Sequence, residues 1–274
     1  MKRFFLLFIF TASLTFAQYS YETLYLSPSV YFTNGNYSTS VKSNSISFYN
    51  TLQLIKEFYL INHYDHLLID DKEYDYKQQT FLAGGIVDLF PYYIKFSYAH
   101  YKGDFDYKPF SFSFNDYTNL YNIDLVYYVD WFYLGAAYTH LNQIGFAKAA
   151  SNQVTVRLER ILSNEFFISV KPNFTRLDNG KNLFSASLKL HYAPIADFLL
   201  KVGGFAGERA FYFDSDLLTI FNQNYVQKYQ AFGQVEYSLL ALFNVIAGYQ
   251  HNKFTDFNVD YLYAGIKGNF QIAK

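Results

Sequence analysis

The chain has 274 residues, a formal net charge of -1 and no cysteine. The near-zero charge argues against a nucleic-acid-binding protein, and the absence of cysteine excludes a disulfide framework and thiolate metal sites. Phenylalanine and tyrosine are very frequent, with 31 and 29 residues, which favours a protein with aromatic girdles at a membrane interface.

The amino-terminal stretch MKRFFLLFIFTASLTFAQ has the three regions of a secretory signal peptide. Lys2 and Arg3 precede an apolar run from Phe4 to about Ala12, and the small-residue exit TFA comes before Gln18. The apolar run is too short to cross a bilayer as a helix. We therefore expect residues 1–17 to be a signal peptide and residues 18–274 to form one exported domain.

The exported part divides into alternating segments of about ten residues or more, the length that a tilted barrel strand needs. We predict fourteen strands, near 22–33, 44–55, 57–68, 76–89, 92–102, 118–129, 132–142, 151–161, 165–176, 182–193, 197–207, 227–238, 242–252 and 259–270. Twelve strands is the alternative, because 57–68, 76–89 and 242–252 mix polar and apolar residues on one face. Pro28 and Pro172 fall inside strands, and we interpret them as bulges or strand ends.

The connections alternate between six short turns and seven longer, more polar loops, as expected for a barrel with two unlike ends. The longest loops are KGDFDYKPFSFSFND (102–116) and ERAFYFDSDLLTIFNQNY (208–225). Each of these two loops could bind carbohydrate, fold into the pore or extend its strands above the membrane, and strand extension is the preferred interpretation. An odd number of loops places both termini at the turn end, which is the periplasmic side in an outer membrane.

The two faces of each strand can be assigned from the period-2 pattern. The apolar set is expected to face lipid and includes Leu24, Leu26, Val30, Phe32, Ile46, Phe48, Leu52, Ile94, Phe96, Tyr98, Tyr121, Ile123, Leu125, Tyr127, Phe132, Leu134, Tyr138, Val154, Val156, Leu158, Phe166, Ile168, Val170 and Phe174. The polar set is expected to face the lumen and includes Ser45, Ser47, Thr51, Ser97, Asn122, Tyr133, Gly135, Thr155, Ser169, Asn173, Gln230 and Gln234.

These features together resemble the outer-membrane β-barrel proteins of Gram-negative bacteria. The resemblance implies an all-β, antiparallel up-and-down barrel, a lipid bilayer as surroundings, and a last strand read by the barrel-insertion machinery, with Phe270 in the place of the terminal aromatic residue. The richness in Phe, Tyr, Asn and Lys looks like proteins of the Bacteroidota. Residues 168–192 are similar to YaiO-like barrels, which are associated with surface polysaccharide.

Charged residues of the polar set form the candidate site. Six cations lie about three to six residues from the turn ends and are expected to make a basic band in the lumen: Lys95, Arg157, Lys171, Lys189, Lys201 and Lys267. The acids of the same face are Asp124, Glu159 and Glu236. Because charged rings set pore selectivity, the surplus of cations predicts a preference for anions or acidic sugars. The alternative is that the cations are ordinary lumen residues paired with their neighbours, such as Arg157 with Glu159.

No motif for covalent chemistry or metal binding stands out. His63, His66, His100, His140 and His251 are expected near the loop ends, and the spacing in HYDH places His63 and His66 on opposite faces. A general base would need a Ser or Asp within reach, as in a pairing of His140 with Asp116, but no spacing singles one out.

The sequence therefore predicts an outer-membrane channel or export barrel, without cofactor or metal, that passes a hydrophilic solute or polysaccharide. The alternatives are a docking barrel whose surface loops bind carbohydrate or partner proteins, and an outer-membrane hydrolase.

Overall fold

A computed structural model describes residues 24–39, 41–145, 148–216, 218–221, 225–240 and 242–272. The expected signal peptide, residues 1–17, lies outside the described residues. No helix in the described part of the chain is long and apolar enough to cross a membrane.

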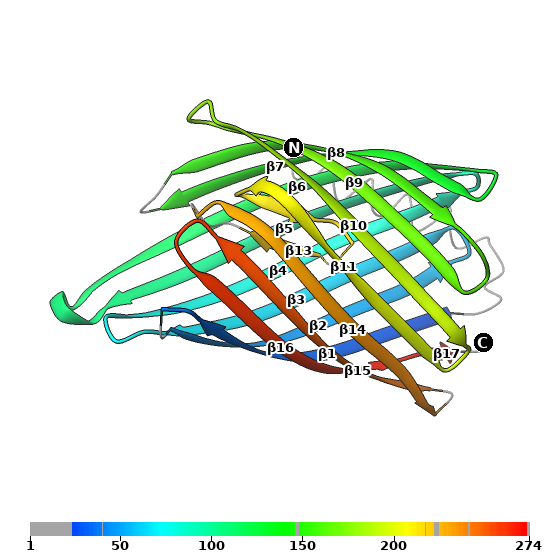
Figure 1. The fold of residues 1–274 in the computed structure, drawn as a ribbon, viewed down its shortest axis with the longest axis horizontal. Helices are drawn as coiled ribbons and strands as arrows, with labels where there is room; N and C mark the ends of the chain where they lie inside the picture. Colours follow the sequence, from blue (N-terminus) through cyan, green and yellow to red (C-terminus); the bar gives the residue numbers. More distant parts are fainter. Residues whose placement is uncertain are drawn as a thin grey trace, which may run out of the picture.

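The structure is a closed antiparallel barrel of fourteen strands, so the prediction of fourteen is confirmed and twelve is wrong (Figure 1). The barrel strands are β1 (Leu24–Tyr37), β2 (Lys42–Ile55), β3 (Phe58–Asp70), β4 (Tyr74–Leu89), β5 (Tyr92–Tyr107), β6 (Phe112–Val129), β7 (Phe132–Gly145), β8 (Ala149–Ile161), β9 (Phe166–Leu177), β10 (Asn182–Ile195), β11 (Phe198–Arg209), β14 (Gln227–Leu240), β15 (Phe243–Phe254) and a last strand in two pieces, β16 (Asn258–Gly268) and β17 (Phe270–Ile272). Each strand pairs with its neighbour in the chain, with β11 followed by β14.

The barrel closes where β1 pairs with both pieces of the last strand. Ser29 lies opposite Lys267 in β16, and Leu26 lies opposite Phe270 in β17, so the register is the same on both sides of the interruption. Pro28 lies beside this interruption, and its nitrogen has no hydrogen to donate to a ladder.

The interpretation of the two prolines as bulges or strand ends is wrong. Pro28 pairs in register with Asn50, and Pro172 pairs in register with Ala186. Around Pro172, pairing between β8 and β9 stops after Thr155 and resumes at Leu158 without a shift. A missing N–H therefore leaves a local gap in one ladder, while the strand itself continues.

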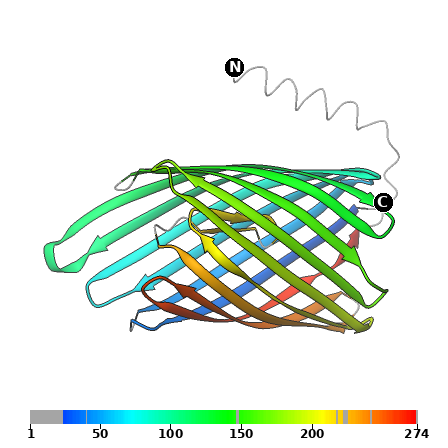
Figure 2. The same cartoon turned by 45° about the horizontal axis from the view of Figure 1, so that its top comes forward.

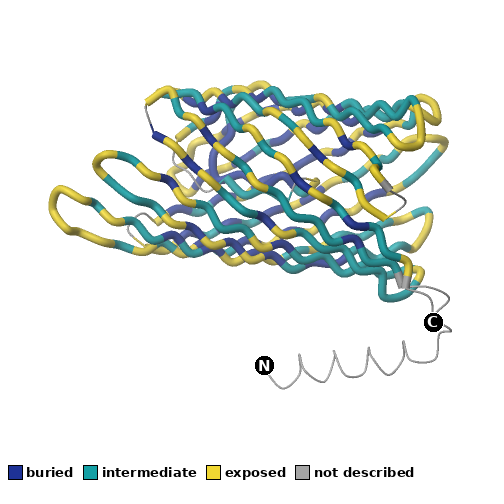
Figure 3. Tube along the Cα trace, turned by 90° about the horizontal axis from the view of Figure 1, so that it is seen from below, coloured by how far each residue is buried: buried dark blue, intermediate teal, exposed yellow. Residues whose placement is uncertain are grey.

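The predicted division into two faces is confirmed, since exposed and buried residues alternate along the strands (Figure 3). On the outer face, aromatic side chains form two rows at different heights. Near the turn end, ring centroids lie 5.0 Å apart in Tyr92–Tyr127 and 4.4 Å apart in Phe166–Tyr192. Nearer the loop end they lie 5.3 Å apart in Tyr98–Tyr121 and 4.8 Å apart in Phe174–Phe184. Two such rows bounding an apolar band are typical of barrels that span a membrane.

The two longest loops behave differently. β5 and β6 continue as a protruding hairpin and are joined by a short 3-10 helix, Lys108–Phe110, so 102–116 is a strand extension as preferred (Figure 1). The described part of 208–225 instead turns inward and forms a separate two-stranded sheet of β12 (Tyr212–Asp214) and β13 (Thr219–Phe221), which lies inside the barrel (Figure 2). We call this element the lumenal hairpin. For this loop the preference for strand extension is wrong.

Gly207 lies near the end of β11, just before the chain turns from the barrel wall into the lumen. It has φ of +114°, and the register of β11 with β14 shifts between Ala206 and Arg209. A Cβ atom at this position would lie 2.4 Å from the carbonyl oxygen of Phe184, so only glycine fits this close approach.

Candidate functional site

The lumenal hairpin runs down the inner face of β8. Ser151 Oγ donates to the carbonyl of Phe211 at 2.8 Å, and the Gln153 amide donates to the carbonyl of Phe213 at 2.9 Å. Further toward the turn end, Arg157 reaches Asp216 with Nη2 and Oδ1 3.1 Å apart. Ser151 and Arg157 are six positions apart, which corresponds to about 20 Å along a strand. The hairpin therefore extends from the loop end deep into the lumen.

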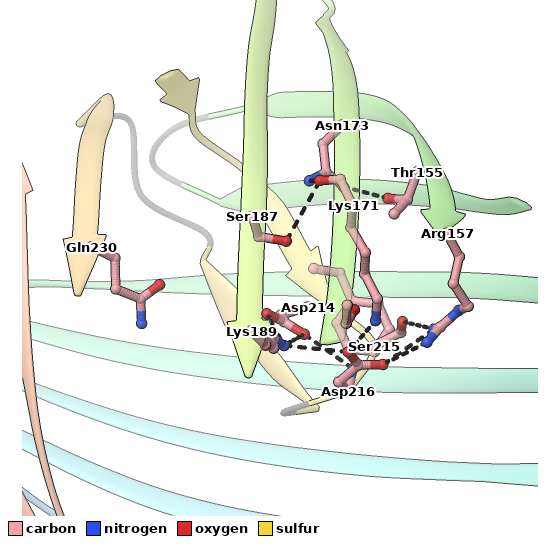
Figure 4. Close-up of polar contacts among 12 residues, drawn as sticks. Thr155, Arg157, Lys171, Asn173, Ser187, Lys189, Asp214, Ser215, Asp216 and Gln230 are labelled. Carbon is pink, nitrogen blue, oxygen red and sulfur yellow. Dashed lines mark hydrogen bonds and ion pairs between the residues drawn. The ribbon is translucent and has the colours of Figure 1, made fainter. Parts of the chain in front are cut away.

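Its tip ends in a buried cluster of ion pairs (Figure 4). Arg157 contacts three carboxylates, at 2.6 Å from Asp124, 2.7 Å from Glu159 and 3.1 Å from Asp216. Asp124 and Glu159 come from the wall, on β6 and β8, and only Asp216 comes from the hairpin. The Arg157 side chain is 5% exposed, so these contacts form in a largely water-excluded setting where an unpaired charge is costly.

Two lysines from the next strands complete the cluster. Lys171 on β9 contacts Glu159 at 3.4 Å and also pairs with Asp216. Lys189 on β10 lies 3.2 Å from Asp214 and 3.3 Å from Asp216. Cations from three adjacent strands thus meet two carboxylates from the lumenal hairpin.

Apolar contacts inside the lumen hold the part of the hairpin that is nearest the loop end of the barrel, which we call its upper part. Phe211 and Phe213 are 4% and 2% exposed and belong to a core cluster within the barrel. The wall supplies Leu82, Leu120, Leu141, Leu177 and Leu183 to this cluster, all on the lumen-facing parity near the loop end. Two buried apolar residues, Leu82 of β4 and Ile246 of β15, lie on the inner face among polar residues. They explain why segments 76–89 and 242–252 mix polar and apolar residues on one face.

Arg209 secures the point where the loop leaves β11. Its guanidinium carbon lies 3.5 Å from the ring centroid of Phe205, 4.5 Å from that of Tyr212 and 4.7 Å from that of Phe221. Its nitrogens donate to Gln227 at 2.9 Å and Gln230 at 2.6 Å. Cation–π contacts and amide acceptors therefore satisfy a buried guanidinium.

A cavity of about 730 Å³ remains beside the hairpin. On the β1–β4 side its wall runs from Ser27 and Thr51 toward the turn end to Thr33 and Ser45 toward the loop end. Ser27 and Thr33 are six positions apart, about 20 Å along the strand. Five tyrosines also line the cavity: Tyr31, Tyr49, Tyr101, Tyr261 and Tyr263.

The cavity has two unlike sides. The hairpin contributes Leu218, Ile220, Phe221 and Asp216, and the opposite strands contribute mostly hydroxyl groups. A carboxylate on the hydroxyl side, Asp65, accepts a hydrogen bond from Ser47 at 2.5 Å.

All six cations of the predicted basic band lie on the lumen-facing parity. Lys201 and Lys267 share Glu236, at 3.4 Å and 3.6 Å, and Lys95 lies directly across from Asp124 in the β5–β6 register. Among the described residues, ion pairs are found for five of the six, with Lys95 the exception. Because Asp214 and Asp216 fold in, the expected surplus of three positive charges falls to one.

The histidines do not form one site. His100 and His140 lie on the outer face, each with Nδ1 3.0 Å from an Asn oxygen on the next strand, Asn119 and Asn152. His140 is therefore placed with Asn152, whereas Asp116 lies across from Gly145 in the β6–β7 register. His251 Nδ1 lies 2.7 Å from Asp260 in the same arrangement.

His63 lies on the inner face and stacks on Tyr49 with ring centroids 4.1 Å apart, whereas His66 has the opposite parity, as predicted. Among the described residues, no cluster of three or more His, Asp and Glu could hold a metal.

Neither a protein-family model nor a curated protein matches this sequence. Solved structures do match. The monoaromatic hydrocarbon channel CymD aligns with a TM-score of 0.60 over 93% of this chain and 90% of that chain, at 7% identity. The toluene transporter TbuX from Ralstonia pickettii aligns at 0.59 over 92% and 90%, with 8% identity.

A third solved structure matches with similar coverage and similarly low identity. The toluene transporter TodX from Pseudomonas putida aligns with a TM-score of 0.58 over 90% of this chain and 88% of that chain, at 9% identity. Identities this low show a common architecture and nothing about the solute. The chain therefore has the fold of these membrane-transport β-barrels.

Proposed function

We propose that this chain is an outer-membrane channel that passes a small polar solute through the passage beside the lumenal hairpin. The observation that carries the proposal is the cavity of about 730 Å³, which follows the inner wall for about half the length of β1 and β2. Its volume is within the range of about 300–1,000 Å³ that small-molecule sites occupy. The hairpin narrows the lumen and so limits the size of the solute.

The lining favours an uncharged polyhydroxy solute. Serine and threonine hydroxyls both donate and accept hydrogen bonds, and tyrosine rings offer flat apolar faces, a combination suited to sugars. The predicted preference for anions has less support, because Asp214 and Asp216 neutralise much of the basic band in this conformation. The similar structures are a monoaromatic hydrocarbon channel and two toluene transporters, whereas the hydroxyl-lined wall here favours a polar solute.

The proposal includes location and orientation. Residues 1–17 would direct export, and the turn end, where β1 begins and β17 ends, would face the periplasm. The similarity of residues 168–192 to YaiO-like barrels would make a polysaccharide or its fragments the solute. A Bacteroidota-like source is compatible with the composition and adds nothing to the mechanism.

The experiment is swelling of proteoliposomes in uncharged sugars of increasing size. The wild-type chain should pass monosaccharides faster than trisaccharides. A variant with residues 211–221 replaced by a short Gly-Ser linker should pass both, because the lumen loses its constriction. The matched control shortens the β5–β6 hairpin by a similar number of residues, outside the lumen, and should keep the wild-type size limit.

Two results would contradict the proposal. If neither the wild-type chain nor the linker variant allows swelling, the barrel is not a channel and serves as a docking barrel. If the β5–β6 control changes the size limit as much as the linker variant, the lumenal hairpin is not the constriction.

A further inference from the structure

Three cations of the barrel wall surround the tip of the lumenal hairpin, and we call them the cradle. Some of their carboxylate partners belong to the wall and others belong to the hairpin. Arg157, Lys171 and Lys189 project from β8, β9 and β10, which are consecutive strands of the wall. Their side chains are 5%, 5% and 8% exposed. All three contact Asp216, which places one hairpin carboxylate at their centre (Figure 4).

The wall alone does not balance this cradle. Without the hairpin, Arg157 would keep Asp124 and Glu159, and Lys171 would keep Glu159. Lys189 would keep no partner, because its ion-pair partners in the described part of the chain are both on the hairpin, Asp214 and Asp216. Together with Lys95, which lies across from Asp124 in the β5–β6 register, the wall has four cations here against two carboxylates, Asp124 and Glu159, and so lacks the two negative charges that the hairpin supplies. A buried cation without a partner costs several kcal/mol, so the wall needs a dianion in this place.

The cradle is open to a solute in the passage. Arg157, Lys189 and Asp216 all line the cavity. The Asp216 side chain is 24% exposed, more than the three cations that hold it. A solute moving along the passage would therefore meet the hairpin carboxylate at the edge of the cradle and could compete for its partners.

The contacts that hold the hairpin would allow a bound anion to take the place of its tip. β12 and β13 form a separate sheet and make no ladder with the barrel. The upper part is held by apolar contacts of Phe211 and Phe213, but the tip, from Asp214 to Asp216, is held chiefly by ion pairs. Ion pairs can be exchanged for a competing anion, whereas an apolar contact has no such competitor.

We infer that Arg157, Lys171 and Lys189 form a binding site for a small dianion, such as a phosphate or sulfate group, and that Asp214 and Asp216 occupy this site in the absence of ligand. The planar guanidinium of Arg157 suits the tetrahedral oxygens of such a group, and the lysines add charge. Binding would displace the hairpin tip and widen the passage. This inference rests on the proposed channel for its physiological role, but the site can be tested without transport.

The test uses a single cysteine on the hairpin, which is possible because the chain has no cysteine of its own. Ser215→Cys lies between the two aspartates, and its reaction with a neutral maleimide in detergent reports access to the tip. Sulfate is the probe, with chloride at matched ionic strength as the control. Sulfate should raise the labelling rate at least threefold, and chloride should not. Equal effects of the two salts would show charge screening and overturn the inference.

A second measurement uses Asp214→Asn together with Asp216→Asn in the full chain. The cradle then has no internal competitor, so calorimetry should show sulfate binding at least tenfold tighter than in the wild type. Adding Lys189→Gln should weaken that binding. The matched control is Glu236→Gln, which removes an acid paired with Lys201 and Lys267 away from the hairpin, and it should keep the wild-type affinity. Gel migration is compared between unheated and heated samples of each variant, and a difference between the two shows that the barrel is folded.

No sulfate binding to the folded double variant would overturn the inference. The two proposals fail in distinguishable ways. Sugar flux without a sulfate response leaves the channel and removes the dianion site. A sulfate response without sugar flux leaves the dianion site and removes the channel.

Discussion

Gln153 of β8 and Phe213 of the lumenal hairpin are joined by two hydrogen bonds of 2.9 Å each, one in each direction. The amide nitrogen donates to the carbonyl of Phe213, and the amide oxygen accepts from its backbone N–H. A side chain of the wall thus satisfies both backbone groups of a residue whose strand, β12, makes no backbone ladder with a barrel strand. Buried backbone groups need such partners, so this amide makes the inward course of the loop possible.

Replacing Gln153 by Glu should loosen the hairpin. The carboxylate cannot donate to the Phe213 carbonyl, and leaving that group unsatisfied costs about 1–3 kcal/mol. We expect faster cleavage of the 211–221 segment by added protease, with the barrel itself intact. The control is Asn152→Asp on the same strand, which makes the same amide-to-acid change on the outer face and should leave the cleavage rate unchanged.

Phe213→Ala should release the hairpin by removing its apolar anchor. Truncating a fully buried phenylalanine costs about 3–5 kcal/mol, and Phe213 is only 2% exposed. Single-channel current should increase or become noisy. Phe184→Ala makes the same truncation at a site that is 65% exposed on the outer face and should leave the current unchanged. An equal change in both variants would contradict docking through Phe213.

Leu188→Arg should destabilise the folded barrel in lipid. Leu188 lies on the outer face of β10, midway between Tyr192 and Phe184 in the two aromatic rows, and is 52% exposed. Arginine at the bilayer midplane of such barrels costs about 2–4 kcal/mol, and close to zero near the interface. Reversible unfolding in vesicles should show this loss for Leu188→Arg and little loss for Asn182→Arg at the loop end of the same strand. Equal losses would contradict the membrane position.

The proposed orientation predicts which introduced cysteines are labelled on intact cells. Phe110, at the tip of the protruding β5–β6 hairpin, is 80% exposed. An impermeant maleimide should label Phe110→Cys on the cell surface but label Asp130→Cys, in a short turn, only after the outer membrane is opened. The reverse pattern would place the turn end outside the cell.

The barrel was readable from the sequence because most strands alternate between residues on the outer face and residues on the inner face, which gives the sequence a period of two. Leu188, Lys189 and their neighbours therefore reveal both faces, and the lumen-facing position of the six cations followed. The course of 208–225 was not readable, because its partners are side chains such as Gln153 and Arg157 rather than a strand with its own pattern. One signal was available: Leu82, Leu120, Leu141 and Leu183 share the parity of the polar lumen residues. Apolar side chains in a wet lumen require an apolar partner there, which is the hairpin.

The most direct test of the account is single-channel recording under a salt gradient, with the wild type compared with the Asp214→Asn, Asp216→Asn double variant. We predict a small, stable wild-type conductance with nearly equal permeability to cations and anions, because the hairpin carboxylates balance the basic band. The double variant should conduct more and prefer anions, since the cradle loses two negative charges. Silence from both folded barrels, or identical reversal potentials, would contradict a lumen whose size and charge are set by the hairpin.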